Sequence, residues 1–361
     1  MTTLAAAGPA EEGRSNRQAG PIDVSTGVTE AEWDGYLSAH PDATSDHLWG
    51  WGRVIDRAFD HRPVYLAARR CGQIVGVLPL VLFDSRVFGR SVTSLPFLNY
   101  GGIVADDTDT EAALLAHGVS LARAFGARHL ELRHARRQFD HLPCRQHKLA
   151  LRRSLPATPD ALWAETDRKV RNQVRKAQKA DLVTVQGGAE LLPDFYDVFA
   201  RNMRDLGTPV YARRFFDEAV RVFPDRTRLT VVRTGPRPVA AAVTVRWRDT
   251  VLVPWASSLR EYRHLCPNML LYWTMLEQAV TSGVTTFDFG RSSPGSGPHQ
   301  FKLQWGARET PLTWEYVLLA REAPPDQGPS NRKLRLAIEA WRRLPLGVAN
   351  WFGPWIGRQL P

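Results

Sequence analysis

The sequence is poor in cysteine, in lysine and in long apolar runs. Its three cysteines, Cys71, Cys144 and Cys266, form no C-x-x-C pair, so neither a disulfide framework nor a structural zinc site is supported. No apolar run approaches the roughly 18–20 residues that a membrane-spanning helix needs. The N-terminal segment also lacks the charged and apolar regions of a signal peptide, so we expect a cytoplasmic protein.

Several motifs of common enzyme classes are missing as well. The sequence has no H-E-x-x-H, no G-x-S-x-G, no G-x-G-x-x-G and no G-x-x-x-x-G-K-[ST]. Asp288-Phe289-Gly290 spells the magnesium motif of kinases, but the V-A-I-K and H-R-D motifs that accompany it in kinases do not occur. Zinc hydrolases, serine hydrolases, dinucleotide enzymes and kinases therefore have no support, and we expect no metal.

The chain is strongly basic. It has 47 Lys and Arg against 37 Asp and Glu, for a formal net charge of +10. Such an excess favours an anionic partner such as a nucleic acid. Arginine supplies nearly all of it, however, and an arginine-rich composition also arises in GC-rich genomes. Both interpretations stay open.

The order of the predicted elements indicates two similar halves. In the first half we expect helices from Thr29 and over 47–59, a β-hairpin turning at Cys71-Gly72, a helix over 109–125 and a strand from His129. A hairpin around Gly235, a helix over 267–282 and a strand from Thr286 repeat this order about 160 residues later. The repeat favours a tandem duplication of one α/β unit, and chance similarity is the alternative.

These patterns predict an α/β (α+β) fold in four parts. We expect a disordered leader over 1–28, because residues 1–27 contain too few apolar side chains to pack. Two domains follow over 29–155 and 156–321, and a linker with an amphipathic helical tail occupies 322–361.

A basic helical stretch begins the second domain. Leu162, Val170 and Val174 give the segment 160–180 one apolar edge, and the rest of its surface is mostly basic. A solvated helix face is the usual meaning of this pattern.

The tail is rich in both arginine and aromatic residues. Leu334 to Leu346 reads as an amphipathic helix, and Trp351-Phe-Gly-Pro-Trp-Ile follows it. Such a segment suits a membrane interface, and it equally suits an apolar clasp that packs on the domain. The clasp is favoured.

The run from Phe287 to Gly306 carries the clearest chemical signal. A strand containing Asp288 leads to Arg291, then to a Ser/Gly loop with unpaired backbone N–H groups, then to Lys302. Such a loop with nearby cations is suited to bind a phosphate or a developing oxyanion. This chemistry fits acyl transfer by direct attack of an amine, which needs no covalent nucleophile.

Long runs of the sequence resemble the FemAB-like acyltransferases of the GNAT superfamily, especially the branch associated with exosortase (PEP-CTERM) and exopolysaccharide systems. The resemblance extends from about Asp46 to Tyr316. It is carried by 61–69, 76–80, 85–91, the segment Leu95-Pro-Phe-Leu-Asn-Tyr-Gly-Gly102, 202–211, and Phe287-Asp-Phe-Gly-Arg-Ser through Phe301-Lys-Leu-Gln-Trp-Gly306. It implies two GNAT-like domains in tandem.

The resemblance also implies substrates. Members of this family move an amino acid from aminoacyl-tRNA, and relatives in the broader fold use acyl-CoA. We favour acyl-CoA here, because the family's coiled-coil tRNA arm has no counterpart in this sequence; aminoacyl-tRNA, and with it tRNA as a partner, is the alternative. The expected acceptor is an amine of a phosphorylated or lipid-linked saccharide precursor.

Two further site predictions come from the resemblance. The basic segment looks like the family's K-x-R-x-x-[IV]-[RK]-x-A-x-[RK] pattern, in which Arg171 inherits a contact to acceptor phosphate and Arg175 lies nearby. Lys302 matches a lysine that stabilises the acceptor or the transition state. Ser292, Gly295 and Gly297 are the predicted donor loop, although this loop has one residue more before its first glycine than the GNAT pattern.

The remaining candidates have structural alternatives. Asn99 and Tyr100 either shape a cleft or form a plain turn. Arg204 and Tyr211 either bind substrate or serve as a helix cap and a surface ion pair. Asp288 is either a base or, as we favour, a strand-end residue that orients Arg291.

At the level of the whole protein the alternative to an acyltransferase is a catalytically idle scaffold of polysaccharide or exosortase assembly.

Overall fold

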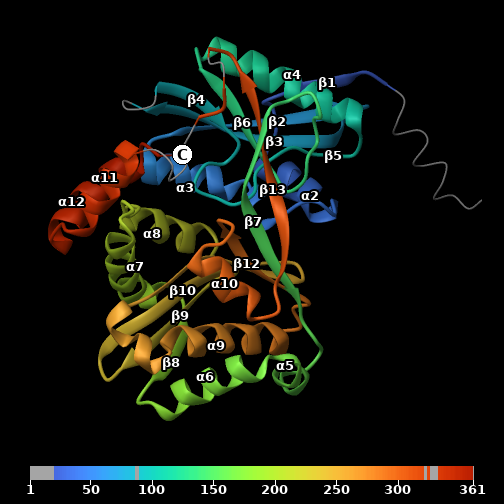
Figure 1. Ribbon diagram of the computed structural model, residues 1–361. Coiled ribbons are helices and arrows are strands. Elements are labelled where there is room, and N and C mark those ends of the chain that lie inside the picture. Colours follow the sequence, from blue (N-terminus) through green and yellow to red (C-terminus); the bar gives the residue numbers. More distant parts are fainter. Residues whose placement is uncertain (1–19, 86–88, 321–322, 326–331, 361) are drawn as a thin grey trace, which may run out of the picture.

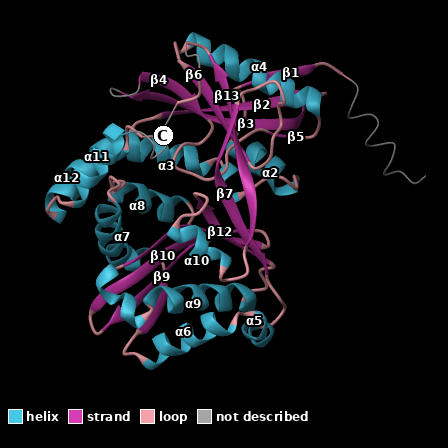
Figure 2. Ribbon diagram, in the orientation of Figure 1, coloured by secondary structure: helices cyan, strands magenta, loops and turns pink. Residues whose placement is uncertain are grey.

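The computed structural model describes residues 20–85, 89–320, 323–325 and 332–360. Its strands form one mixed sheet in the order β1-β2-β3-β4-β6-β13-β7-β12-β11-β10-β9-β8, and β5 pairs with β3 beside this path. Figure 1 shows the two halves of the chain one above the other, with β7 and β13 running between them. Helices cover the sheet in both halves (Figure 2).

The first half follows the predicted element order. Its elements are β1 (Ile22–Ser25), α2 (Glu30–Ala39), the short helix Ser45–His47, α3 (Gly50–Phe59), β2 (Arg62–Arg70), β3 (Gln73–Ser85), β4 (Gly89–Thr93), β5 (Val104–Ala105), α4 (Thr108–Ala124) and β6 (His129–His134). The predicted capping box begins α2. The Thr29 hydroxyl accepts from the Glu32 N–H, and the Glu32 carboxylate accepts from the Thr29 N–H. The predicted hairpin turn has positive φ at both Cys71 and Gly72.

The second half repeats this order after an inserted pair of helices. The first half ends with β7 (Cys144–Ser154). The elements of the second half are α5 (Pro159–Glu165), α6 (Arg168–Lys179), β8 (Val183–Gly187), α7 (Leu192–Leu206), α8 (Arg213–Val222), β9 (Thr227–Thr234), β10 (Arg237–Trp247), β11 (Thr250–Ser258), α9 (Pro267–Thr281), β12 (Thr286–Ser292), α10 (Gly297–Leu303), β13 (Arg308–Leu318), α11 (Arg332–Arg342) and α12 (Leu346–Gly357).

Parallel pairing occurs at the same place in each half. β4 pairs in parallel with β6, and β11 pairs in parallel with β12. The β11–β12 register ends at Leu252↔Asp288, although both strands continue beyond these residues, so the strands diverge there. A sheet that opens at the carboxyl ends of parallel strands leaves a natural ligand site.

The halves exchange strands with each other. β7, which ends the first half, pairs with β12 of the second half, and β13, which follows β12, pairs with β6 of the first half. β7 and β13 also pair with each other, so the sheet continues through the molecule. The predicted domain boundary at 155 lies in the loop between β7 and α5.

The largest apolar core lies between the halves. It joins α2 and α3 of the first half with α7 and α8 of the second, and the inner faces of both parts of the sheet enclose it. Trp51 shows the mixing, because its ring lies 4.8 Å from that of Phe223 and 6.2 Å from that of Trp255. Burial of such aromatic surface fixes how the halves sit relative to each other.

Two predicted features differ from the structure. Residues 22–25, expected in the disordered leader, form β1, which pairs with β2 from Ile22↔Arg70 to Ser25↔Ala67; the expectation of disorder is wrong for residues 20–28. The basic segment 160–180 is two helices rather than one, because the side chain of Asp167 caps the N-terminus of α6 and forces a break. The predicted apolar edge is buried in both helices.

The tail docks on the body, as the clasp interpretation expected. Arg204 donates to the Leu344 carbonyl at 3.1 Å, and His61 Nε2 lies 2.8 Å from the Arg358 carbonyl. α11 and α12 both pack on α7. In the part of the chain that the structure describes, no helix combines the length and apolar character that a bilayer crossing requires.

Candidate functional site

A cavity of about 260 Å³ lies between the two halves. The first half lines it with 41–45, 47, 100, 102–104, 133–136 and 138, and the second with residues of β10, β11 and the loop between them. Arg152 of β7 and Asp288 of β12 line it as well, at the place where β11 and β12 diverge. Because Arg152 lies on β7, this strand also forms part of the cavity wall.

Asp288 is the most heavily bonded group of this cavity. The residue is 1% exposed, and its side chain accepts three hydrogen bonds: from the Tyr100 hydroxyl at 2.7 Å, from Arg152 Nε at 2.8 Å and from the Gly290 N–H at 2.8 Å. The guanidinium of Arg152 also stacks over the Tyr100 ring at 5.1 Å. A carboxylate with three donors is held in place, which supports an orienting role over the role of a base. The side chains that Asp288 bonds are Tyr100 and Arg152, however, whereas the predicted partner Arg291 donates to the Leu98 carbonyl.

Tyr100 is a hydrogen-bond donor in this arrangement. Burial, and then the charge of Asp288, raise the pKa of Tyr100 well above its usual value. The phenol thus keeps its proton at any physiological pH and continues to donate to Asp288. Of the predicted pair Asn99 and Tyr100, Tyr100 lines the cavity and Asn99 does not.

A second buried carboxylate, which the sequence did not single out, positions that segment. Asp46 Oδ2 accepts from the backbone N–H groups of Asn99 at 2.9 Å and Tyr100 at 3.1 Å. Burial raises the pKa of Asp46 to about 6. In the sequence, Asp46 is only an aspartate that precedes a predicted helix. No local pattern connects it to Asn99 and Tyr100, which lie more than fifty positions away.

Lys302 of α10 is buried beside the same strand end. Its Nζ donates to the carbonyl oxygens of Gly290 at 3.3 Å and Arg291 at 3.0 Å, and burial lowers its pKa to about 8. An ammonium has three donors, so one N–H remains beyond these two bonds. Glycine at position 290 lets β12 lie close to β11. Its φ is +72°, and an added Cβ would lie 2.7 Å from the Val253 carbonyl oxygen of β11.

Lys148 of β7 is a second lysine at this loop, and the sequence did not single it out. Its Nζ donates to Ser293 Oγ at 2.8 Å, and burial, together with the charge of Arg291, lowers its pKa to about 8. The antiparallel pairing of β7 with β12 aligns Leu149 with Ser292, which brings Lys148 to the loop. Pairing between strands more than 130 residues apart leaves no local signal.

Arg291 adds a third cation to this cluster. It donates to the Leu98 carbonyl at 3.1 Å and stacks over Trp314 at 5.3 Å, and burial lowers its pKa to about 10. Beside it, the buried hydroxyl of Ser292 has no hydrogen-bond partner among the described residues. Three partly desolvated cations and an unsatisfied hydroxyl favour binding of an anionic group.

The glycine loop itself differs from the prediction. The N–H of Gly295 donates to His299 Nδ1 at 3.1 Å, and Ser296 caps α10, of which Gly297 is the first residue. The Ser296 N–H bonds to the Ser293 carbonyl. The expectation of unpaired N–H groups is therefore wrong at Gly295 and Ser296, because the loop folds onto its own side chains.

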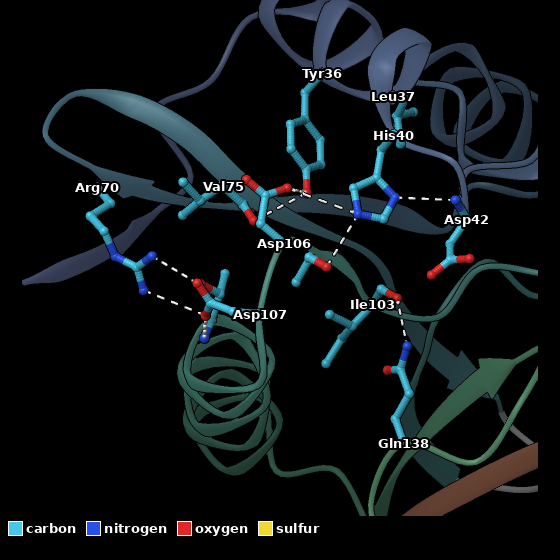
Figure 3. Close-up of polar contacts among 12 residues, drawn as sticks. Tyr36, Leu37, His40, Asp42, Arg70, Val75, Ile103, Asp106, Asp107 and Gln138 are labelled. Carbon is cyan, nitrogen blue, oxygen red and sulfur yellow. Dashed lines mark hydrogen bonds and ion pairs between the residues drawn. The ribbon is translucent and has the colours of Figure 1, made fainter. Parts of the chain in front are cut away.

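The wall of the cavity is held by a polar network. His40 Nε2 lies 3.2 Å from the Ala105 carbonyl, and its Nδ1 accepts from the Asp42 N–H; Gln138 donates to the Ile103 carbonyl at 3.1 Å (Figure 3). Tyr36 donates to Asp106 at 2.9 Å, which fixes the end of α2 over β5. These contacts give the cavity a rigid side.

His134 also lines the cavity, but both of its ring nitrogens are occupied. Nδ1 lies 2.5 Å from Glu315 Oε2, and Nε2 accepts from the Ile103 N–H at 3.0 Å. Burial lowers the pKa of this imidazole. It is a neutral wall residue that joins β6 to β13.

Of the six predicted substrate residues, only Tyr100 belongs to the cavity lining. Asn99 is its neighbour in the chain, and the other four lie in other segments. Arg171 and Arg175 are on α6, which packs on α9, and Arg175 stacks over Trp163. Arg204 pairs with Asp205 at 2.7 Å as well as with the tail, and Tyr211 packs its ring against those of Phe59, Phe97 and Phe215. Roles for these four residues in substrate binding stay predictions.

Comparison with known proteins finds one family model that matches part of the chain. Residues 164–303 match the model described as an acetyltransferase (GNAT) domain. The chain carries a GNAT acyltransferase domain. This GNAT domain includes α6, the diverging strands β11 and β12, Asp288 and Lys302. No curated protein matches the chain by sequence.

Solved structures share the fold over most of the chain. FemX aligns with a TM-score of 0.64 at 15% identity, covering 82% of this chain and 98% of FemX. A tandem GNAT protein from the clavulanic acid biosynthesis pathway aligns with a TM-score of 0.53 at 14% identity, covering 85% and 100%. The C-terminal domain of a putative lysylphosphatidylglycerol synthetase from Agrobacterium fabrum gives 0.54 at 13% identity, covering 80% and 90%. The predicted tandem GNAT-like fold is confirmed.

Proposed function

We propose that this protein transfers an acyl or aminoacyl group to an amine of a phosphorylated or lipid-linked saccharide precursor of the cell envelope. The amine attacks the donor carbonyl directly, and no acyl group is attached to the enzyme. The observation that carries the proposal is the cluster of Lys302, Lys148 and Arg291 around one strand end of the GNAT domain. These three cations are not among the lining residues of the cavity, but Asp288, three residues before Arg291 on the same strand, is.

The chemistry requires charge stabilisation more than a nucleophile. As the amine nitrogen bonds to the carbonyl carbon, the carbonyl oxygen gains negative charge, and the remaining N–H of Lys302 is suited to stabilise it. The intermediate collapses by breaking the bond from carbon to the sulfur or oxygen of the donor. The amine loses a proton, and the leaving group takes one up.

Asp288 supports this step indirectly. It fixes Tyr100 and Arg152 at the cavity, and the exposed part of Arg152 is suited to pair with a phosphate of the acceptor. Arg171 is proposed to contact the same class of acceptor from α6, as the family resemblance implies.

Acyl-CoA is the donor we favour, since GNAT acetyltransferase domains in general take their acyl group from it. Aminoacyl-tRNA is the second candidate, and the fold shared with FemX favours keeping it. A role in exosortase or exopolysaccharide systems belongs to the same proposal and rests on the resemblance. Contact with the inner face of the cytoplasmic membrane is a separate proposal that rests on the tail.

Thermal-shift measurements test the donor. The protein is screened with acetyl-CoA, longer acyl-CoAs, aminoacyl-tRNA and nucleotide-linked sugars, with Lys302→Met and Lys148→Met as matched variants. A donor at a hundred times its Kd stabilises the native state by about 2.7 kcal/mol, and we expect this for acyl-CoA, with a smaller shift in Lys148→Met and a nearly unchanged shift in Lys302→Met. Stabilisation by tRNA alone would replace acyl-CoA as the donor, and no response to any donor would contradict the enzymatic proposal.

A further inference from the structure

The last helix of the described chain, α12, has two faces of opposite character. One face carries Ala349, Gly353 and Gly357, spaced four residues apart and buried against the body. An added Cβ at Gly353 would lie 3.0 Å from the Val210 nitrogen, and one at Gly357 would lie 3.0 Å from the Val210 carbonyl oxygen. Small residues therefore let the helix backbone approach the body closely.

The other face of α12 is apolar and open to solvent. Val348, Trp351, Phe352 and Trp355 follow the i, i+3, i+4, i+7 spacing of one helical stripe. Trp351 is 74% exposed, Trp355 is 51% exposed and Phe352 is 44% exposed. We call these four residues the aromatic face. Scattered apolar residues on a surface are ordinary, but four adjacent ones with two tryptophans mark an interaction surface.

Bonds at both ends hold the helix in this orientation. Before α12, the Leu344 carbonyl accepts from Arg204; after it, the Arg358 carbonyl lies 2.8 Å from His61 Nε2, and the Gln359 carbonyl accepts from Ser85 at 3.3 Å. The aromatic face thus cannot turn inward without breaking these contacts. One side of α12 therefore packs on the body of the protein, and its other side is the exposed aromatic face.

Charge selects the kind of partner. The residues of α12 include no acidic or basic side chain, and the preceding segment 332–343 has five basic residues and one acidic residue. Arg342 and Arg343 are exposed next to the start of α12, in a chain of net charge +10. Tryptophan beside arginine suits the boundary between lipid headgroups and acyl chains, where the indole is half apolar and the guanidinium meets lipid phosphate.

The length of the helix decides how it would sit. Its 12 residues span about 18 Å, against about 30 Å for the hydrocarbon core of a bilayer. The geometry points to α12 as a peripheral membrane anchor that lies in the plane of an anionic lipid surface, with the aromatic face inserted. This inference stands on the tail alone. If it holds, an acceptor carried by a lipid would lie in the same membrane surface that the protein binds.

Co-sedimentation with vesicles tests the anchor without any activity assay. The full chain is mixed with vesicles of phosphatidylcholine alone and with vesicles containing phosphatidylglycerol. We expect binding to the anionic vesicles that weakens as salt rises, because the arginine contribution is screened. Trp351→Ser with Trp355→Ser should lower the partition coefficient by about tenfold or more.

The matched control is Val183→Ser with Val185→Ser, which removes exposed apolar surface from the edge strand β8. This variant should bind vesicles as the native protein does. Trp351→Ser alone serves if the double tail variant unfolds, since this side chain is the most exposed of the face. Unchanged vesicle binding in the folded tail variants would overturn the inference. So would a tail-dependent dimer in light scattering without vesicle binding, because a second copy would then cover the face. Vesicle binding without transfer activity would leave the anchor intact and contradict only the proposed function.

Discussion

Replacing Asp288 by asparagine separates an orienting residue from a catalytic base. The carboxylate accepts three hydrogen bonds, two at Oδ2 from Tyr100 and Arg152 and one at Oδ1 from the Gly290 N–H. Asparagine has one acceptor oxygen. If that oxygen keeps the place of Oδ2, the new amide group meets the Gly290 N–H, donor against donor, and Arg152 loses its counter-charge.

The magnitude follows from these contacts. A hydrogen bond to a charged group contributes about 1.5–3 kcal/mol, and a buried donor left without an acceptor adds to the loss. We therefore expect Asp288→Asn to lower the free energy of unfolding by about 2–4 kcal/mol, measured by denaturant titration. The displaced Tyr100 and Arg152 should lower kcat by about ten- to a hundredfold.

Tyr100→Phe is the matched control, because it removes one donor and leaves the carboxylate intact. It should lower stability and kcat in the same direction and by less. The orienting role would be refuted if Asp288→Asn kept full stability but lost more than about a thousandfold in kcat, while Tyr100→Phe remained almost unaffected. Asp288 would then be the base.

Three other predictions concern the cations. Burial lowers the pKa of Lys302 from 10.5 to about 8. Because the ammonium form is the active one, kcat should fall as pH rises through about 8. The free energy of unfolding should rise between pH 8 and 10.5, because in that range the lysine still binds its proton in the unfolded state but no longer in the folded state. Lys302→Met should lower kcat by about 10²–10³ with little change in donor affinity and should abolish this alkaline limb; a loss below about fivefold would contradict the assignment. Lys148→Met should instead raise the donor Kd by roughly tenfold in calorimetry and leave the limb in place, and equal kcat effects of both variants would contradict their separate roles. Arg171→Ala should raise the acceptor KM by about ten- to a hundredfold, and an equal effect of Arg168→Ala would indicate diffuse steering rather than one phosphate contact.

Local sequence signals were sufficient for the elements and for part of the site. The capping box at Thr29, the turn at Cys71-Gly72 and the repeated order of strands and helices depend on neighbouring residues, and the structure confirms them. Asp288 and Lys302 lie fourteen positions apart in one motif, and they meet at one strand end.

Long-range pairing accounts for what the sequence did not reveal. Lys148 and Arg152 reach the site only because β7 crosses to pair with β12, and Asp46 meets Tyr100 across more than fifty residues. The strand β1 was missed for a related reason: a short polar segment at a sheet edge gains its stability from pairing with β2 rather than from its own composition. The two faces of α12 needed the docking contacts with Val210, since the sequence alone does not say which stripe is buried.

The central claim is direct acyl transfer at the cation cluster, and mass spectrometry of both enzyme and product tests it most directly. Native protein and Lys302→Met are each incubated with the donor that gives the largest thermal shift and with an amine-bearing, phosphorylated saccharide. The account predicts acylated saccharide from the native protein, little from the variant, and an unchanged protein mass at every time point. An acyl adduct on the enzyme that forms and decays with turnover, or equal product from both proteins, would contradict it.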